Sequence, residues 1–463
     1  MRKHILLVTI PSYGHIIPLL ELARRIAPFH RVTFAVSQFE LGEIRQRELV
    51  SSEDPFTLHG IPDGYFLLES EKSQSGQIFQ KIHQFVIPGT VAFLKALPIP
   101  SPHDTDHKNE GSAPSLQDPV DVVIGDNILG VALRVLHERG IPFHIFNTAS
   151  SSMTYVSLLV CEDTPSRPDP PNDNQMKFIE APDPTVTPKP ISDAIKTMFL
   201  QMHEMTLLAA GIVENSVYEL EVDAVEAIRK HPDMQGRPFR SVGPLIPTTE
   251  RTSGTNGERA KEIEAWLDKQ ESLSVIYISF GTVAAPKVAD MQEIIGALKA
   301  IGKPFIWSLR KEEQARLPAE LLSEISDWSL GLVRNWVPQK LVLQHRATSV
   351  FVTHCGWNSS LEAIAYGVPV VAWPMFADQM LNGLGLVRKG MAVLIQGTGI
   401  TSDIVVSGEE LKSALMGVGV GGVTNRGEDN PFRKAALAWK ETLKVATSPG
   451  GSSHAEFLEL MKF

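Results

Sequence analysis

The same alternation of strand-like and helix-like segments occurs in both halves of the chain, and it limits the fold more than any other sequence feature. In the first half, the strand-like run 4-HILLVTI-10 precedes apolar positions spaced as one helical face, and 31-RVTFAVS-37 follows. The pattern returns over 120–146 and again over 274–373. Strand, helix and strand in this order are typical of doubly wound α/β units with a parallel sheet.

The length of the chain and one polar segment predict two domains. A sequence of 463 residues exceeds what one hydrophobic core usually supports. The Gly, Thr and Ser-rich segment 247–261 separates the two alternating regions. We therefore predict an N-terminal domain over 1–246, a linker over 247–261 and a C-terminal domain over 262–463. Two facing Rossmann-like domains would place an active site in the cleft between them, beyond the carboxyl ends of the strands.

The composition excludes several classes of protein. The 43 basic and 53 acidic residues give a net charge of −10, so a general nucleic-acid binder is not expected. Two cysteines, Cys161 and Cys355, are too few for a disulfide framework and fit a reducing compartment. No segment approaches roughly 18 consecutive apolar residues. We therefore expect a cytoplasmic enzyme with no membrane span and no nucleic-acid partner. A monomer is our separate expectation, which the composition does not establish.

A His and a Cys are adjacent in the segment 350-VFVTHCGWNSSLEAIAYG-367. The pattern predicts a strand that ends at His354 and a helix that begins near Ser359. Ser359 and Glu362 have the spacing of a capping box, and Gly367 stands where a helix C-terminal glycine belongs. These residues alone are compatible with a purely structural role. A helix N-terminus after a Gly-containing loop also offers N–H groups and a positive dipole, which suit a phosphate.

Metal, thiol and nicotinamide chemistry receive less support. Cys355 has no second Cys at metal-ligand spacing, so we predict no zinc site. A hydrolase using Cys355 and His354 is disfavoured because adjacent residues on a strand point to opposite faces. The segment 417-GVGVGG-422 satisfies the pattern G-x-G-x-x-G, but the helix-like run 409–416 precedes it where a dinucleotide fold requires a strand.

The most specific pattern in the chain covers the 44 residues from Trp336 to Gln379. Trp, Pro-Gln, His-Cys-Gly-Trp-Asn-Ser, Glu, Gly-Val-Pro and a terminal Asp-Gln occur there in order. This interval resembles the signature box of the plant-type, family-1 UDP-sugar glycosyltransferases. The segments 277-YISFGTVAAP-286 and 305-FIWSLR-310 are most similar to their flavonoid 3-O-glucosyltransferase branch. The resemblance implies a GT-B architecture whose last helix packs back on the N-terminal domain, with a UDP-sugar as co-substrate and no cofactor or metal.

The resemblance also implies a site for the sugar donor. Trp336 would stack on the uracil ring, while the Val337 backbone and the Gln339 amide would read its polar edge. Oriented dipoles and hydrogen bonds would replace a metal ion at the leaving diphosphate. The residues implied are Thr282, His354, Asn358 and Ser359 for the diphosphate, Glu362 for the ribose, and Trp357, Asp378, Gln379 and Thr148 for the sugar.

The catalytic base implied by the resemblance is His15, with Asp126 as the carboxylate that orients it. We place His15 in the turn between the first strand and the first helix. The predicted reaction is an inverting transfer of a hexose to give a β-glycoside. The terminal Gln of the box indicates that the hexose is glucose. Asn147 departs from the flavonoid branch, which often has Trp there.

The acceptor is predicted to be a small lipophilic molecule, a flavonoid or another phenolic. Its pocket would come from the N-terminal half, around Tyr13, Phe85, Ile87 and Asn127. Two other interpretations remain open on sequence grounds. One is a non-catalytic protein that binds a UDP-sugar or a hydrophobic ligand, and the other is a different sugar-nucleotide enzyme such as an epimerase.

Overall fold

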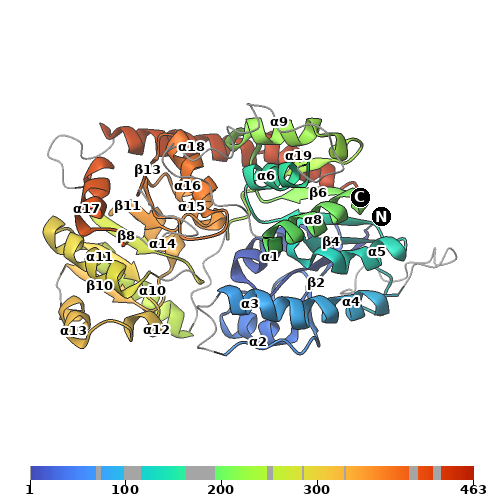
Figure 1. The fold of residues 1–463 in the computed structure, drawn as a ribbon, viewed down its shortest axis with the longest axis horizontal. Coiled ribbons are helices and arrows are strands. Elements are labelled where there is room, and N and C mark those ends of the chain that lie inside the picture. The colour runs from blue at the N-terminus through green and yellow to red at the C-terminus, as the bar shows by residue number, and fades with distance from the viewer. Residues whose placement is uncertain are drawn as a thin grey trace. The chain divides into compact units, whose positions relative to one another are not determined.

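Two compact units make up the protein, as the computed structural model shows, and each contains one β-sheet. Unit 1 comprises Met1–Phe66, Ile78–Ile246 and Ala446–Phe463, and unit 2 comprises Leu67–Gln77 and Pro247–Val445. Figure 1 colours most of unit 1 from blue to green and most of unit 2 from yellow to orange. The structure describes residues 2–68, 75–98, 116–162, 193–247, 254–283, 286–327, 330–395, 405–420 and 429–463.

Unit 1 is built on a parallel sheet with the strand order β3-β2-β1-β4-β5-β6-β7. The order reverses between β1 and β4, which makes the carboxyl ends of these two strands the place where a doubly wound sheet binds ligands. The strands are β1 His4–Val8, β2 Arg31–Ser37, β3 Thr57–Ile61, β4 Val122–Asp126, β5 Phe143–Asn147, β6 Gly211–Glu214 and β7 Phe239–Ser241.

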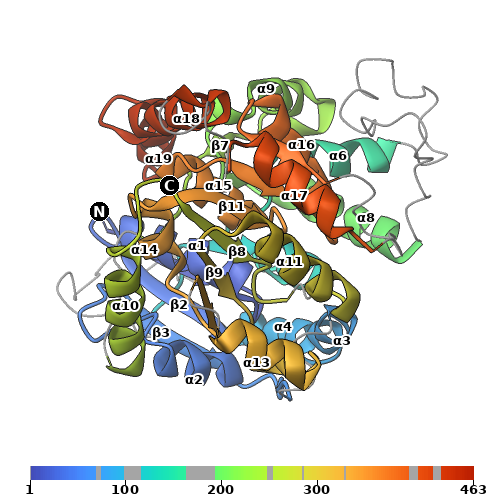
Figure 2. The same cartoon turned by 90° about the vertical axis from the view of Figure 1, so that its left-hand side faces the viewer.

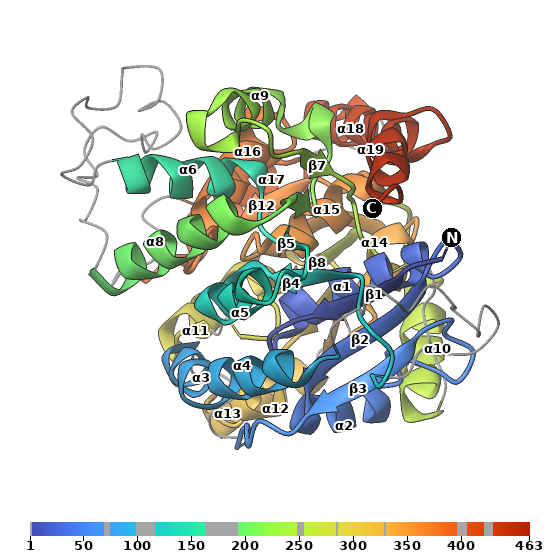
Figure 3. The ribbon, with the colours of Figure 1, turned by 90° about the vertical axis from the view of Figure 1, so that its right-hand side faces the viewer.

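Helices surround the sheet of unit 1, with α6 and α8 side by side and α19 beside β7 (Figure 3). The α-helices are α1 Tyr13–Ile26, α2 Gln38–Gln46, α3 Ser75–Lys81, α4 Ile87–Ala96, α5 Arg134–Glu138, α6 Ser151–Glu162, α8 Asp193–Leu208, α9 Val222–Lys230 and α19 Ser452–Leu460. A π-helix, η2, covers Ile82–Val86, and short 3₁₀-helices cover Asn127–Leu133 (η3), Tyr218–Leu220 (η4) and Pro232–Met234 (η5).

Unit 2 has a six-stranded parallel sheet with the order β10-β9-β8-β11-β12-β13, so its reversal point lies between β8 and β11. Its strands are β8 Val275–Ser279, β9 Phe305–Ser308, β10 Gly331–Arg334, β11 Thr348–Thr353, β12 Val370–Ala372 and β13 Ala392–Leu394. Its helices are α10 Gly254–Leu267, α11 Val288–Ile301, α12 Lys311–Gln314, α13 Ala319–Asp327, α14 Gln339–Gln344, α15 Trp357–Tyr366, α16 Gln379–Arg388, α17 Gly408–Gly417 and α18 Pro431–Thr447. Figure 2 shows α11 and α17 packed side by side.

The central strands are buried along their whole length and mostly apolar, because both faces of a parallel sheet are covered by helices. All five residues of β1, with the sequence HILLV, are buried, and so are all five of β8, VIYIS. The core of unit 1 joins β1, β2 and α1 to Phe457 and Leu460 of α19. The core of unit 2 includes Trp307 on β9, whose ring is fully buried. The strand-like apolar runs in the sequence therefore correspond to the central strands of the two sheets.

Most of the strands and helices predicted from periodicity are present, and the structure corrects three details. Helix α1 begins at Tyr13, so His15 lies in its first turn and not in the preceding loop. Helix α15 begins at Trp357 with Gly356 as its N-cap residue, so Ser359 and Glu362 form no capping box. Residues 254–261 of the predicted linker belong to helix α10, and residues 248–253 lie outside the described residues.

Two other local predictions are confirmed. Helix α15 ends at Gly367, which has a positive φ of 69°, a conformation that favours glycine. Helix α17 occupies the place where a dinucleotide fold would need a strand before 417-GVGVGG-422. Residues 421 and 422 lie outside the described part of the chain.

Candidate active site

The reversal point of unit 1 brings His15 and Asp126 together. Asp126 is the last residue of β4, and His15 lies in the first turn of α1, which follows the neighbouring strand β1. The two side chains are 2.9 Å apart, measured from His15 Nδ1 to Asp126 Oδ2. Because a carboxylate only accepts hydrogen bonds, Nδ1 carries the proton and Nε2 has the lone pair in the neutral ring. The pair therefore has the arrangement of a general base and its orienting carboxylate.

The carboxylate of Asp126 is held from several sides. Its Oδ2 also accepts a hydrogen bond of 2.7 Å from the Thr9 hydroxyl, and its Oδ1 accepts one of 2.9 Å from the Ile128 N–H. Complete burial acts to raise the pKa of Asp126, but the charge of His15 and these hydrogen bonds prevail, and the pKa lies below its ordinary value. Asp126 is therefore ionised at neutral pH and can stabilise a protonated His15.

Thr148 is the third residue at this end of the sheet. Its hydroxyl lies 3.3 Å from His15 Nδ1, directly after β5, which ends at Asn147. Since Nδ1 donates, the Thr148 oxygen accepts. The structure thus places Thr148, predicted to lie near the sugar, in contact with the predicted base.

A buried polar network lies behind Thr148 and includes a carboxyl group that sequence reasoning missed. The Asn147 amide donates to Glu214 Oε1 over 2.9 Å, and the hydroxyls of Ser151 and Thr154 donate to Glu214 over 2.5 and 2.6 Å. Burial and the nearby charge of Glu221 raise the pKa of Glu214 to about 8, although these donors act to lower it. Asn147 thus anchors the end of β5 through this network.

The reversal point of unit 2 contains His354, which follows β11. Its ring lies so close to Gly281 and Gly356 that neither position has room for a side chain. A Cβ on Gly281 would lie 2.7 Å from His354 Nε2, and a Cβ on Gly356 would lie 2.6 Å from the same atom. Burial lowers the pKa of His354 to about 4, so the imidazole is neutral at pH 7. It can therefore donate or accept a hydrogen bond without adding a charge.

Three predicted donor-site residues lie together where α14 and α15 meet. The Gln339 amide nitrogen donates to Ser359 Oγ over 3.2 Å and also to Glu362 Oε2. Its oxygen accepts a hydrogen bond of 3.1 Å from Tyr277 Oη, and the Tyr277 ring stacks on Phe351 at 4.8 Å. Gln339 thus orients Ser359 and Glu362. Tyr277 was missed as a supporting residue, although it begins the motif YISFGT.

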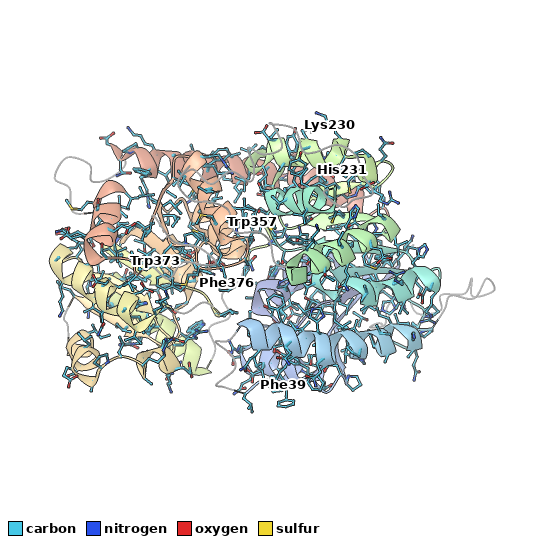
Figure 4. All side chains as sticks on the ribbon, in the orientation of Figure 1. Phe39, Lys230, His231, Trp357, Trp373 and Phe376 are labelled. Carbon is cyan, nitrogen blue, oxygen red and sulfur yellow. The ribbon has the colours of Figure 1, made fainter. Side chains whose placement is uncertain are left out.

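Asp378 and Gln379 lie at the start of α16 and have different surroundings. Asp378 is the N-cap residue of the helix. Gln379 is buried, and its side-chain oxygen accepts from the N–H groups of Met375 and Phe376 over 2.8 and 2.9 Å. Figure 4 labels Phe376 in this loop and Trp357 on α15. Gln379 therefore shapes the loop with its oxygen and retains its amide nitrogen as a donor group.

The remaining predicted residues differ in exposure. Val337 and Trp357 are buried, whereas Trp336, with 36 % of its surface exposed, offers a ring face for stacking. Thr282 is exposed, and its carbonyl accepts a hydrogen bond from the Arg310 guanidinium. The sequence did not single out Arg310 as a supporting residue. Asn358 lies in the first turn of α15.

Three further findings bear on the excluded functions. Among the described residues, no group of three or more His, Cys, Asp or Glu side chains is arranged to hold a metal ion. In the same part of the chain, no helix has the length and apolar character needed to cross a membrane. Cys161 and Cys355 are both buried, and neither forms a disulfide.

Known proteins resemble this chain in sequence and in fold. The family described as "UDP-glucoronosyl and UDP-glucosyl transferase" matches residues 221–416. A nuatigenin 3-beta-glucosyltransferase of Solanum aculeatissimum is 29% identical, over 98% of this chain and 95% of the relative. The crystal structure of TcCGT1 in complex with UDP has a TM-score of 0.78 and 25% identity, covering 100% of this chain and 99% of that one. UGT71G1 of Medicago truncatula, solved with UDP-glucose, has a TM-score of 0.77 and 23% identity, covering 100% of this chain and 98% of that one.

The two Rossmann-like sheets and these neighbours define the GT-B fold, and the sequence matches support a UDP-glycosyltransferase enzyme. The matches along almost the whole chain support its place among the plant family-1 UDP-sugar glycosyltransferases. They do not favour the non-catalytic or epimerase interpretation, and they do not single out the flavonoid branch.

Proposed function

We propose that this enzyme transfers glucose from UDP-glucose to a hydroxyl group of a flavonoid or another small phenolic, with inversion at the anomeric carbon and without a metal ion. The observation that carries the proposal is the hydrogen bond of 2.9 Å between His15 Nδ1 and the buried Asp126 carboxylate. The name of the Solanum relative, a 3-beta-glucosyltransferase, supports glucose as the sugar and a β-linked product.

The proposed reaction is a single displacement. His15 Nε2 takes the proton of the acceptor hydroxyl while the acceptor oxygen attacks the anomeric carbon. A new bond forms between that oxygen and the carbon, and the bond from the carbon to the diphosphate oxygen breaks. UDP leaves with the electron pair of that bond, and the imidazolium formed on His15 is stabilised by the ionised Asp126. Attack from the face opposite to UDP inverts the α-linkage to a β-glycoside.

The donor-site residues act by binding and by stabilising charge. We assign the uracil to the ring face of Trp336 with Val337 and Gln339, and the ribose hydroxyls to Glu362. The diphosphate would lie at the start of α15, where backbone N–H groups and the helix dipole favour an anion. His354, Asn358, Ser359 and Thr282 would donate further hydrogen bonds to it, and a neutral His354 does so without titrating near pH 7. Trp357 would pack beside the sugar, Asp378 and Gln379 would bind its hydroxyls, and Thr148 would lie near its 6-hydroxyl.

The acceptor class is inferred from the sequence. The flavonoid or phenolic class rests on the similarity of 277-YISFGTVAAP-286 and 305-FIWSLR-310 to the flavonoid branch. Tyr13 and Asn127, two of the residues predicted around the acceptor, lie two residues before His15 and one residue after Asp126. The cytoplasmic location and the monomeric state stay predictions.

The test is to incubate the purified protein with UDP-glucose, with and without a mixture of flavonols and simple phenols, in the presence of EDTA. Release of UDP and a mass gain of one hexose on an acceptor are expected. Loss of transfer on addition of EDTA would contradict the metal-independent mechanism. Tight UDP binding with no transfer to any acceptor would contradict the phenolic acceptor class. Failure to bind UDP or UDP-glucose would contradict the donor assignment.

A further inference from the structure

One buried amide joins the beginnings of α15 and α16. Asn382 lies on α16 and is only 3% exposed. Its Nδ2 donates one hydrogen bond of 3.0 Å to the Cys355 carbonyl oxygen and another of 3.0 Å to Asp378 Oδ2. The group has two hydrogens, and both are used. Asn382 thus connects the turn before α15, assigned to the diphosphate, with the carboxylate assigned to the sugar.

The orientation of the Asn382 amide follows from its partners. The Cys355 carbonyl and the Asp378 carboxylate are both acceptors, so the amide nitrogen must face them. The Asn382 oxygen is then buried with no hydrogen-bond partner among the described residues. An unpaired buried acceptor costs stability. Packing alone therefore does not explain an Asn at position 382. The two hydrogen bonds that its amide nitrogen donates do explain it.

The conformation of Cys355 explains why its carbonyl needs to be held. Cys355 has a φ of +62°, the left-handed region that favours glycine, and its side chain is completely buried. Its N–H donates to the Thr353 hydroxyl over 3.3 Å, and its carbonyl also accepts a long hydrogen bond of 3.4 Å from Ser360. This turn connects β11 to α15 and sets the direction of the first N–H groups of the helix. A donor on the Cys355 carbonyl stabilises the unfavourable turn.

We propose that Asn382 is a positioning residue for the sugar donor. It holds the left-handed turn at Cys355, and so the N-terminus of α15, in the geometry that binds the diphosphate. The same amide holds the Asp378 carboxylate in the orientation that binds the hexose hydroxyls. This inference rests on the proposed function, because it needs a UDP-hexose as the ligand. It adds a residue outside the signature box that fixes the two parts of the donor relative to each other.

The first experiment compares Asn382→Ala and Asn382→Asp with a matched control, Asn430→Ala. Asn430 is a buried Asn of the same unit that donates over 2.9 Å to the Val418 carbonyl, far along the chain from the predicted site residues. Dissociation constants of UDP and UDP-glucose are measured by calorimetry, and thermal stability is recorded for each variant. Both Asn382 variants are expected to weaken UDP about tenfold and UDP-glucose further, since hydrogen bonds to the turn and to a charged group are lost. Asn430→Ala is expected to lower thermal stability and leave both constants unchanged.

The second experiment separates positioning from loss of packing. Asn382→Ala is combined with Cys355→Gly, and in parallel with Cys355→Ala as the matched control. Both Cys355 substitutions remove the buried sulfur, but only glycine adopts the left-handed turn without strain. The loss of UDP affinity caused by Asn382→Ala is expected to shrink in the glycine background and to persist in the alanine background. Equal losses in both backgrounds would contradict the role of the turn.

The outcomes also separate this inference from the proposed function. If the unmodified protein binds UDP and UDP-glucose and Asn382→Ala binds both equally well, only the role of Asn382 is overturned. If the unmodified protein binds neither nucleotide, the donor assignment fails, and the inference fails with it.

Discussion

The Nδ1 atom of His15 lies 2.9 Å from Oδ2 of Asp126, although 111 positions separate the two residues in the sequence. The contact exists because β1 and β4 are neighbours in the sheet: Asp126 ends β4, and His15 lies in the helix that follows β1. It fixes the imidazole tautomer in which Nε2 accepts a proton. Two substitutions at this pair distinguish a catalytic role from a structural one.

His15→Ala is expected to lower turnover by at least about 100-fold, the lower range for loss of a general base. UDP binding should be unchanged, because the substitution removes a side chain of unit 1 and none of the donor-site groups of unit 2. Asp126→Asn should also lower turnover, because an amide cannot stabilise the imidazolium and can favour the wrong tautomer. Steady-state kinetics and calorimetric titration with UDP check both variants. Turnover that survives His15→Ala would contradict the mechanism.

The placement of the candidate residues at the carboxyl ends of strands could be predicted from the sequence, since each motif follows a strand-like run. The Asn147 and Glu214 network could not be predicted. Glu214 ends β6, a four-residue strand with no clear periodicity, and its partners lie far apart in the sequence. Which charged residue is buried depends on strand order, and a single sequence does not give that order. Similarly, the turn at Cys355 has a conformation that its residue type does not suggest.

Gly356→Ala is expected to weaken UDP binding by about tenfold, on the scale of one lost charge-assisted hydrogen bond. The new methyl group would lie 2.6 Å from His354 Nε2, so the ring must move away from its place beside α15. Calorimetric titration with UDP measures the effect. Gly296→Ala serves as the control, because it is exposed on α11 with nothing within 4 Å of the added carbon. That control should leave UDP binding unchanged and raise stability by up to about 1 kcal/mol. Equal UDP affinity in Gly356→Ala and the unmodified protein would exclude the proposed place of His354.

Neither thiol is expected to react in the folded protein. Cys355 is fully buried and Cys161 nearly so, and burial raises the pKa of both thiols, that of Cys161 to about 11. A colorimetric thiol reagent at pH 7.5 should therefore detect no free thiol before denaturation and two afterwards. Iodoacetamide should leave transfer unaffected. Rapid inactivation that a substrate prevents would instead restore the hydrolase interpretation based on Cys355 and His354.

The same dependence on tertiary structure explains what was missed in unit 2. The box from Trp336 to Gln379 identified most of the residues assigned to the donor, but not the side chains that hold them. Tyr277 on β8 orients Gln339 on α14, and Asn382 lies three positions beyond the box. Such supporting contacts come from residues whose types are common in any core or helix. Sequence patterns therefore indicate residues with distinctive chemistry, but not the residues that orient them.

The buried Glu214 predicts how stability should change with pH. Its pKa in the folded protein is about 8, above the ordinary value of a carboxyl group. Between about pH 4.5 and 8 the folded protein therefore binds a proton at Glu214 that the unfolded chain has lost. The free energy of unfolding contributed by this group is highest below pH 4.5 and decreases as the pH rises toward 8. Above pH 8 its contribution no longer changes.

Glu214→Gln should remove this part of the pH dependence, because a neutral amide does not titrate and can keep hydrogen bonds to Ser151, Thr154 and Asn147. Relative to the unmodified protein, the variant should gain stability between pH 5 and pH 8, on the order of a few kcal/mol at most. Urea unfolding at several pH values gives the two curves. Glu138→Gln, an exposed carboxyl at the end of α5, is the control and should leave the curve unchanged. If Glu214→Gln and the unmodified protein show the same slope, then Glu214 is ionised in the fold, and its three donors outweigh the effects of burial and of Glu221.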